Sequence, residues 1–163
     1  MIKKPVFNTE VTFVRKRDPL RITYMVCVLL AVLLMALPIG LHNSYYASVD
    51  GEWQDVALPD VSYFDVLIFN PPMLFASYST VIILILTLMW GLESESVIKS
   101  SILTLLSVFA AASSIYVFEF ANKTDITIWS YFISALLVLC AGCRIWMLIR
   151  LLVSNFHSKT KNG

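Results

Sequence analysis

Two cysteines with Cys-x-x-Cys spacing, Cys140 and Cys143, are the most evident candidates for covalent chemistry in this chain. Residues three apart on a helix share one face, so both thiols would point the same way. Both lie in an apolar run, where the reactive thiolate is disfavoured. The third cysteine, Cys27, also lies in an apolar run. The pattern therefore favours small packing residues over a disulfide framework.

The four letters Cys140-Ala141-Gly142-Cys143 resemble the redox motif of quinone-linked thiol oxidoreductases, which are also four-helix membrane proteins of this size. That resemblance implies thiol–disulfide exchange. Such chemistry needs a second cysteine pair to pass electrons outward, and the polar segments hold no cysteine. We therefore expect no redox function.

The only histidines are His42 and His157, and the topology derived below puts them on opposite sides of a membrane. They cannot share a metal site, a haem or a catalytic pair. No activated nucleophile is evident either. The sequence predicts a protein that is not an enzyme and has no cofactor.

A polar stretch between Leu41 and Val66 carries five acids and no Lys or Arg. The acids are Asp50, Glu52, Asp55, Asp60 and Asp65. Their spacing does not match a calcium-binding loop. Two interpretations stay open: a solvated external loop, or a surface that attracts cations or a basic partner electrostatically.

Arg144 is the only basic residue embedded in a long apolar run. A charge inside a membrane span marks function by default. Arg144 lies well into its span, near the expected inner interface. We therefore expect its side chain to reach the interface by snorkelling.

The elements that must position these residues are membrane spans. Of the 163 residues, 58% are hydrophobic and 14% charged, and the mean hydropathy is +0.77. A soluble domain of this size could not bury so much apolar surface. The net charge of only +1 argues against a nucleic-acid partner.

Four apolar runs are long enough to cross about 30 Å of hydrocarbon. They cover 22–41, 72–92, 100–118 and 126–153, and the first is expected to be retained rather than cleaved as a signal peptide. The connecting segments are a basic arm over 1–21, an acidic loop with an aromatic interfacial part over 42–71, turns over 93–99 and 119–125, and a tail over 154–163. Asn70 and Pro71 suit the start of the second helix.

Charge determines the predicted orientation. With both termini in the cytosol, the inner side holds eleven basic residues and four acids, a net +7. The outer side holds one lysine and seven acids, a net −6. Because Lys and Arg favour the cytoplasmic side, we expect an all-α bundle of four transmembrane helices with cytoplasmic termini and one longer acidic external loop.

Small residues recur at helical spacing in the last two spans. The third span has Ser100, Thr104, Ser107, Ala111 and Ser114, and the fourth has Thr127, Ser130, Ser134 and Ala141. Small side chains let helices approach closely in lipid. The two seams either pack against each other or receive a helix from another protein.

In size and layout the chain resembles immunity proteins that protect bacteria from pore-forming toxins, and superinfection- or conjugation-exclusion proteins. That resemblance implies helix–helix contact with another integral membrane protein or a membrane-inserting toxin, in a bacterial inner membrane. Two alternatives stay open: an accessory or scaffold subunit of a larger membrane complex, and an oligomeric pore or leak protein. Homo-oligomer formation also stays open.

Overall fold

The chain is mostly helical, with four helices long and apolar enough to cross a membrane. The computed structural model describes residues 18–49, 51–65, 71–90, 96–120 and 126–161. Most of the predicted basic arm, Asp50, Asn70, part of the turn over 93–99 and most of the turn over 119–125 lie outside these residues, as does part of the aromatic interfacial segment.

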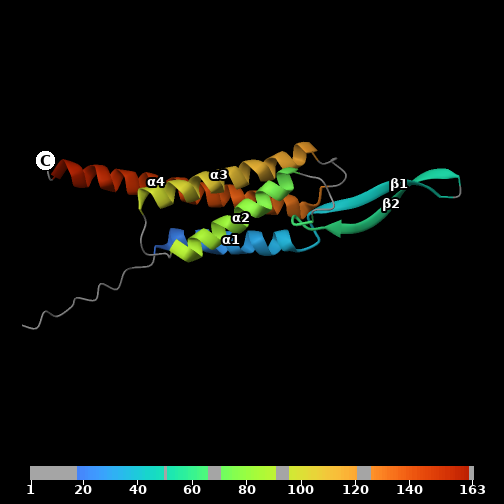
Figure 1. The fold of residues 1–163 in the computed structure, drawn as a ribbon, viewed down its shortest axis with the longest axis horizontal. Helices are drawn as coiled ribbons and strands as arrows, with labels where there is room; N and C mark the ends of the chain where they lie inside the picture. The colour runs from blue at the N-terminus through green and yellow to red at the C-terminus, as the bar shows by residue number, and fades with distance from the viewer. Residues whose placement is uncertain (1–17, 50, 66–70, 91–95, 121–125, 162–163) are drawn as a thin grey trace, which may run out of the picture.

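The four helices lie side by side in a bundle (Figure 1), and each packs against two neighbours. They are α1 (Pro19–Ala36), α2 (Pro71–Trp90), α3 (Val97–Phe120) and α4 (Ile128–Lys161). Helix α1 packs beside α2 and α4, and α3 packs beside the same two helices. This arrangement makes α1 and α3 diagonal partners across the core. The prediction of four spanning helices is confirmed at this level.

Helix α1 is shifted toward the N-terminus relative to the predicted span 22–41. The Asp18 carboxylate caps its start by accepting a hydrogen bond from the Leu20 amide at 3.1 Å. Leu37, the residue before Pro38, is extended, with ψ 147°. Because a following proline disfavours helical backbone, the helix ends at Ala36 although the apolar run continues.

A β-hairpin occupies most of the segment that we expected to be an irregular loop. Strand β1 (Leu41–Val49) pairs antiparallel with β2 (Glu52–Val61), and the pairing begins at Val49 opposite Glu52. Gly51 in the connecting turn has φ +84°, the left-handed region that glycine adopts without strain. The all-α prediction is wrong here, and the sequence signal that we missed is Asp50-Gly51, a strong two-residue hairpin turn.

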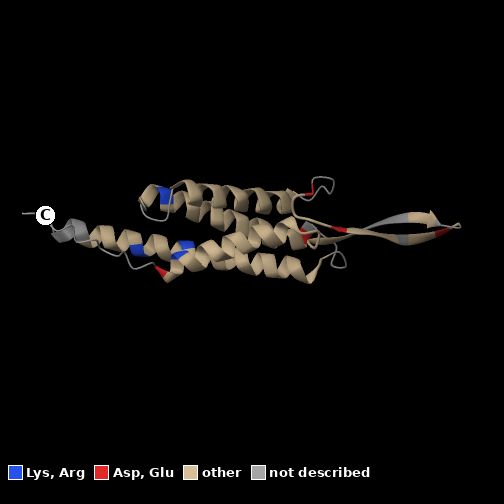
Figure 2. Cartoon of the chain, turned by 90° about the horizontal axis from the view of Figure 1, so that it is seen from below, with Lys and Arg blue, Asp and Glu red and all other residues tan. Residues whose placement is uncertain are grey.

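The hairpin extends beyond one end of the bundle (Figures 1 and 2). At about 3.3 Å per residue, strands of this length span about 30 Å. The start of α1 and the end of α4 lie at the opposite end (Figure 1). The molecule is therefore elongated, with its hairpin and its described terminal segments at opposite ends.

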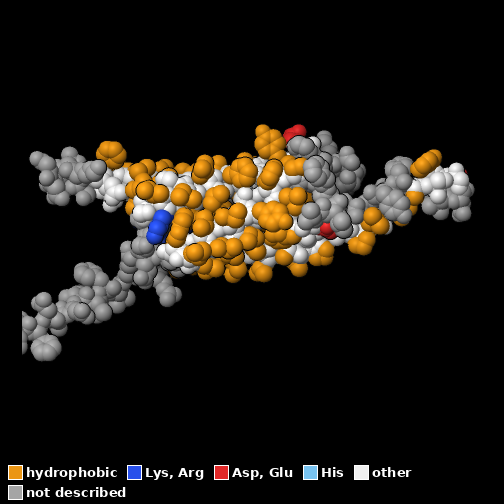
Figure 3. Space-filling view, viewed as in Figure 1, with side chains coloured by type: hydrophobic (Ala, Val, Ile, Leu, Met, Phe, Trp, Pro, Cys, Tyr) orange, Lys and Arg blue, Asp and Glu red, His pale blue; other side chains and the backbone are white. Residues whose placement is uncertain are grey.

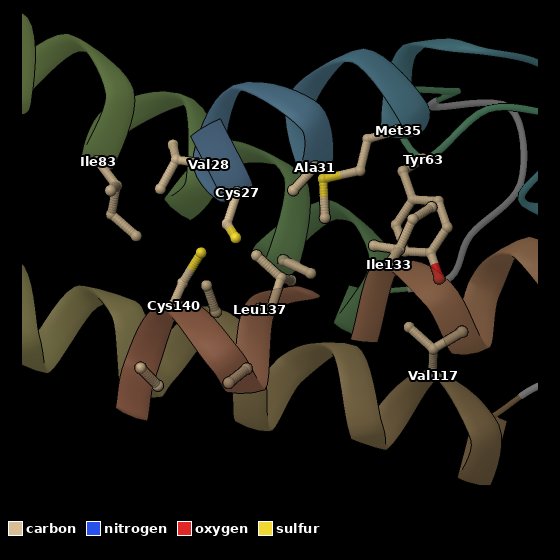
Figure 4. Close-up of a cluster of buried hydrophobic side chains, with 14 of the residues drawn as sticks. Cys27, Val28, Ala31, Met35, Tyr63, Ile83, Val117, Ile133, Leu137 and Cys140 are labelled. Carbon is tan, nitrogen blue, oxygen red and sulfur yellow. The ribbon is translucent and has the colours of Figure 1, made fainter. Parts of the chain in front are cut away.

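The core is formed where the four helices face one another. Ala31 and Met35 of α1, Ile83 of α2 and Ile133 of α4 are almost fully buried (Figure 4). Large apolar side chains cover the outside of the bundle (Figure 3). An exterior of this kind is stable against lipid tails rather than water.

Candidate functional site

The root of the hairpin is held by backbone contacts from three directions. The Gly40 amide donates to the Val61 carbonyl at 2.8 Å, and the Tyr63 amide donates to the Met35 carbonyl at 3.0 Å. Leu41 also forms an isolated bridge with Ile126, just before α4. These bonds tie both strands to the ends of α1 and α4, so the ribbon has a defined exit direction.

Two hydroxyls, one just before α4 and one in its first turn, complete this root. Both Thr127 and Ser130 donate to the Gly40 carbonyl. Both side chains are buried, so these bonds satisfy polar atoms that water cannot reach. Ser130 was predicted to be a helix-packing residue, and its hydroxyl bonds to the hairpin root.

Gly40 and Tyr63 touch so closely that a larger residue at position 40 would force its neighbours to move. A Cβ on Gly40 would lie 2.8 Å from Tyr63 Cδ2 and 3.0 Å from the Val61 carbonyl oxygen. The Tyr63 side chain is fully buried, and burial raises its pKa to about 12 although the nearby Ser130 hydroxyl lowers it somewhat. The phenol is therefore neutral at ordinary pH and acts as a packing group, not as a base.

Beyond its root, the hairpin is an open surface. In the described part of the chain, each strand has the other as its only ladder neighbour apart from the Leu41 bridge, so both strands present edges. Trp53, one residue from the turn, is 72% exposed. An isolated two-stranded ribbon is marginal in water, and unpaired edges with an exposed aromatic are features that other chains bind.

The five predicted acids do not converge on one point. Glu52 begins β2 near the tip, whereas Asp60 lies near the root and its carboxylate is 2.7 Å from His42 Nδ1. Asp65 follows the hairpin, and the side chains of Asp50 and Asp55 lie outside the described part. Among the described residues, no three His, Cys, Asp or Glu side chains are placed to hold a metal ion.

The predicted small-residue seams are buried inside the chain. All of the candidates on α3 and α4 are at most 8% exposed; they are Ser100, Thr104, Ser107, Ala111, Ser114, Ser130, Ser134 and Ala141. Ser134 donates to the Ser114 carbonyl at 3.2 Å, and Thr104 approaches the Arg144 carbonyl at 3.4 Å. Packing within the chain therefore occupies these surfaces, partly between α3 and α4 and partly against α1 and the hairpin root.

Several buried hydroxyls of α2 and α3 bond to their own helix. Thr80 donates to the Ala76 carbonyl at 2.6 Å, and Ser107 donates to the Leu103 carbonyl at 2.7 Å. A hydroxyl turned back onto the preceding helical turn no longer offers its proton to the core. The interior is thus less polar than its serine and threonine content indicates.

Arg144 does not snorkel. Its side chain is only 4% exposed, and its guanidinium carbon lies 4.2 Å from the centre of the Tyr24 ring. The Tyr24 hydroxyl in turn lies 3.5 Å from Ser107 Oγ on the diagonal helix α3. Our expectation for Arg144 was wrong because the ring of Tyr24, far away in sequence, provides a cation–π surface inside the bundle.

The cysteines are free thiols in the core. Cys140 lies opposite Cys27 of α1, and their sulfur atoms point toward each other (Figure 4). Cys143 is also buried. His42 lies on the hairpin and His157 near the end of α4, so the structure keeps the two histidines apart.

Sequence reasoning overlooked three residues that organise these regions: Tyr24, Gly40 and Tyr63. Nothing in the local sequence of the two tyrosines marks them as buried. Gly40 lies two residues after Pro38 and is typical of a helix end, which hides its contact with Tyr63. Comparison with protein-family models, curated proteins and solved structures found no match to this chain.

Proposed function

We propose that this chain is a non-enzymatic multi-pass membrane protein that recognises another protein through its β1–β2 hairpin. The observation that carries the proposal is the projecting ribbon, which has open edges and a 72% exposed Trp53 but is rigidly rooted at Gly40. A surface of this kind gains most when a partner strand or groove covers it. The four-helix bundle is the anchor that orients it.

The expected partner is another integral membrane protein or a membrane-inserting toxin, as for the immunity and exclusion proteins whose layout the chain resembles. We place the chain in a bacterial inner membrane with cytoplasmic termini, so that the hairpin meets the partner outside. Because the small-residue seams are buried within the chain, we assign the contact to the hairpin rather than to those seams. The acids of the hairpin favour a basic partner surface.

The two alternative functions, an oligomeric pore and an accessory subunit, require different features of the structure. A pore would need a polar lining, whereas several buried hydroxyls of α2 and α3 bond to their own helices. An accessory subunit would use the same hairpin but would hold its partner permanently. If the partner always copurifies with this chain in fixed stoichiometry, the chain is an accessory subunit. If the contact forms only in the presence of a toxin, a superinfecting phage or a conjugating plasmid, the function is immunity or exclusion.

A photo-crosslinking amino acid at position 53, in the native host, tests the assignment. We expect a discrete protein adduct at position 53 and none at the matched control position 105, because Leu105 is equally exposed but lies on the apolar face of α3. Deleting the paired segments 44–47 and 54–57 keeps the root, the turn and the register, and should abolish the adduct without unfolding the bundle. An adduct at position 105 alone, or at neither position, would contradict the proposal.

A further inference from the structure

A cavity lies between α1 and α4, at the end of the bundle away from the hairpin. It measures about 200 Å³ and is lined by Asp18, Arg21, Met147, Arg150, Leu151 and Ser154. Two arginines from different helices therefore line one small space together with a serine and two apolar residues. None of these lining residues belongs to the β1–β2 hairpin.

The cavity lies at the depth of lipid headgroups. Arg150 is 22 residues after the start of α4, which corresponds to about 33 Å along the helix. The hydrocarbon core of a bilayer is about 30 Å thick, so Arg150 falls just beyond it. Arg21 is the third residue of α1 and lies at the same end.

The chemistry of the lining fits a phosphate group. Guanidinium groups bind phosphate oxygens through paired N–H donors, and basic pockets between transmembrane helices bind anionic headgroups. Arg150 Nη1 now donates to the Asp18 carboxylate at 3.2 Å, and the Arg150 side chain is 59% exposed. An exposed ion pair of this kind is weak enough to exchange its carboxylate for a phosphate.

The surroundings favour a lipid as the source of that phosphate. Met147 is buried and forms an apolar floor, whereas Ile22 and Ile149, beside the two arginines, are each 47% exposed on the outside of the bundle. A phospholipid could place its phosphate in the cavity and its acyl chains along these side chains. Free phosphate would use only the polar part.

We infer that the cavity between Arg21 and Arg150 binds the phosphate group of an anionic phospholipid. Asp18 competes with the ligand for Arg150 and so sets the affinity. The inference does not depend on the role of the hairpin, and each can fail without the other.

Native mass spectrometry of the purified, delipidated chain in detergent tests this site. We expect dioleoylphosphatidylglycerol to bind with higher affinity than dioleoylphosphatidylcholine. The double variant Arg21→Gln with Arg150→Gln should weaken phosphatidylglycerol binding roughly tenfold or more, the loss expected for charge-assisted hydrogen bonds. Lys99→Gln is the control, because Lys99 lies in the first turn of α3 and does not line the cavity, so binding should be unchanged.

Asp18→Asn separates a binding role from a structural one. Asparagine caps helices as well as aspartate does, so α1 should stay intact. Release of Arg150 should then raise phosphatidylglycerol affinity, by about two- to fivefold. An unchanged or lower affinity would overturn the role of Asp18, and this test remains valid even if the arginine variants fail to fold.

Inorganic phosphate distinguishes the two sources of the ligand. If millimolar phosphate does not displace phosphatidylglycerol, the site recognises the lipid. If phosphate displaces it fully and binds alone with the same dependence on Arg21 and Arg150, a soluble anion is the ligand and the lipid assignment is overturned. Equal binding of phosphatidylcholine and phosphatidylglycerol would overturn the whole inference.

Discussion

Gly40 is the residue on which the hairpin's attachment depends. Its carbonyl accepts bonds from Thr127 and Ser130, its amide donates to Val61, and the Tyr63 ring fills the space where a side chain would be. A single position thus joins the end of α1, both strands and the start of α4. The requirement for glycine here comes from close approach, not from backbone conformation.

We predict that Gly40→Ala destabilises the protein by about 1–3 kcal/mol, the usual cost of overpacking a tight site. The added Cβ would meet the Val61 carbonyl oxygen at 3.0 Å, which as backbone cannot move aside easily. Thermal unfolding in detergent measures the effect. Gly142→Ala is the matched control: a Cβ there meets nothing within 4 Å, so helix propensity should make it neutral or stabilising. Equal melting temperatures for the two variants would contradict the assignment.

The contact between Arg144 and Tyr24, also at the scale of single residues, shows how the protein accommodates a buried charge. The ring face at 4.2 Å supplies electrostatic stabilisation that lipid would not. The same pair links α4 to α1, and the Tyr24 hydroxyl continues the contact to Ser107 on α3. One cation thus connects three helices.

At the scale of elements, the contact between α3 and α4 depends on small residues. Ala110 and Ser114 are fully buried, and Ser134 of α4 bonds to the Ser114 carbonyl. Lipid tails compete equally for bulky apolar side chains, so close backbone approach contributes more to this contact than apolar area does.

Ala111→Leu combined with Ser114→Leu should separate α3 from α4 and lower the thermal stability in detergent. Each insertion into a packed interface costs about 1–3 kcal/mol. Ala112→Leu adds the same side chain on the exposed side of α3 and should have little effect. If the double variant has the same melting temperature as Ala112→Leu, these small residues do not hold α3 and α4 together.

At the scale of the whole molecule, charge and shape are aligned along one axis. The described Lys and Arg side chains lie toward the end with the start of α1 and the end of α4, and most described acids lie toward the hairpin (Figure 2). Helix α4 has 34 residues and so measures about 51 Å, well beyond the hydrocarbon thickness. Its last turns therefore extend past the membrane on the side opposite the hairpin.

The predicted orientation can be measured with an impermeant thiol reagent on intact cells. Asp55→Cys should react from outside, and Thr160→Cys should react only after the cells are permeabilised, because positive charge favours the cytoplasmic side. The native thiols of Cys27, Cys140 and Cys143 are buried, so they should give little background labelling. Reaction of both engineered cysteines from the same side would refute the topology.

The four spans could be predicted because hydropathy is a local property: twenty apolar residues in a row must span a membrane or be buried. The hairpin was also predictable in principle, because Asp50-Gly51 is a local turn signal. We interpreted the segment as a loop because it is short and rich in acidic residues. The start of α1 at Asp18 and its end before Pro38 follow equally local rules.

Tertiary structure alone decided the rest, because the deciding contacts join residues far apart in sequence. Tyr24 lies against Arg144 inside the bundle, and Tyr63, Val61, Thr127 and Ser130 surround Gly40. The cavity likewise exists only where Arg21 of α1 meets Arg150 of α4. Sequence patterns determine which segments enter the membrane, whereas the packing of those segments determines which side chains meet and so where a ligand or partner can bind.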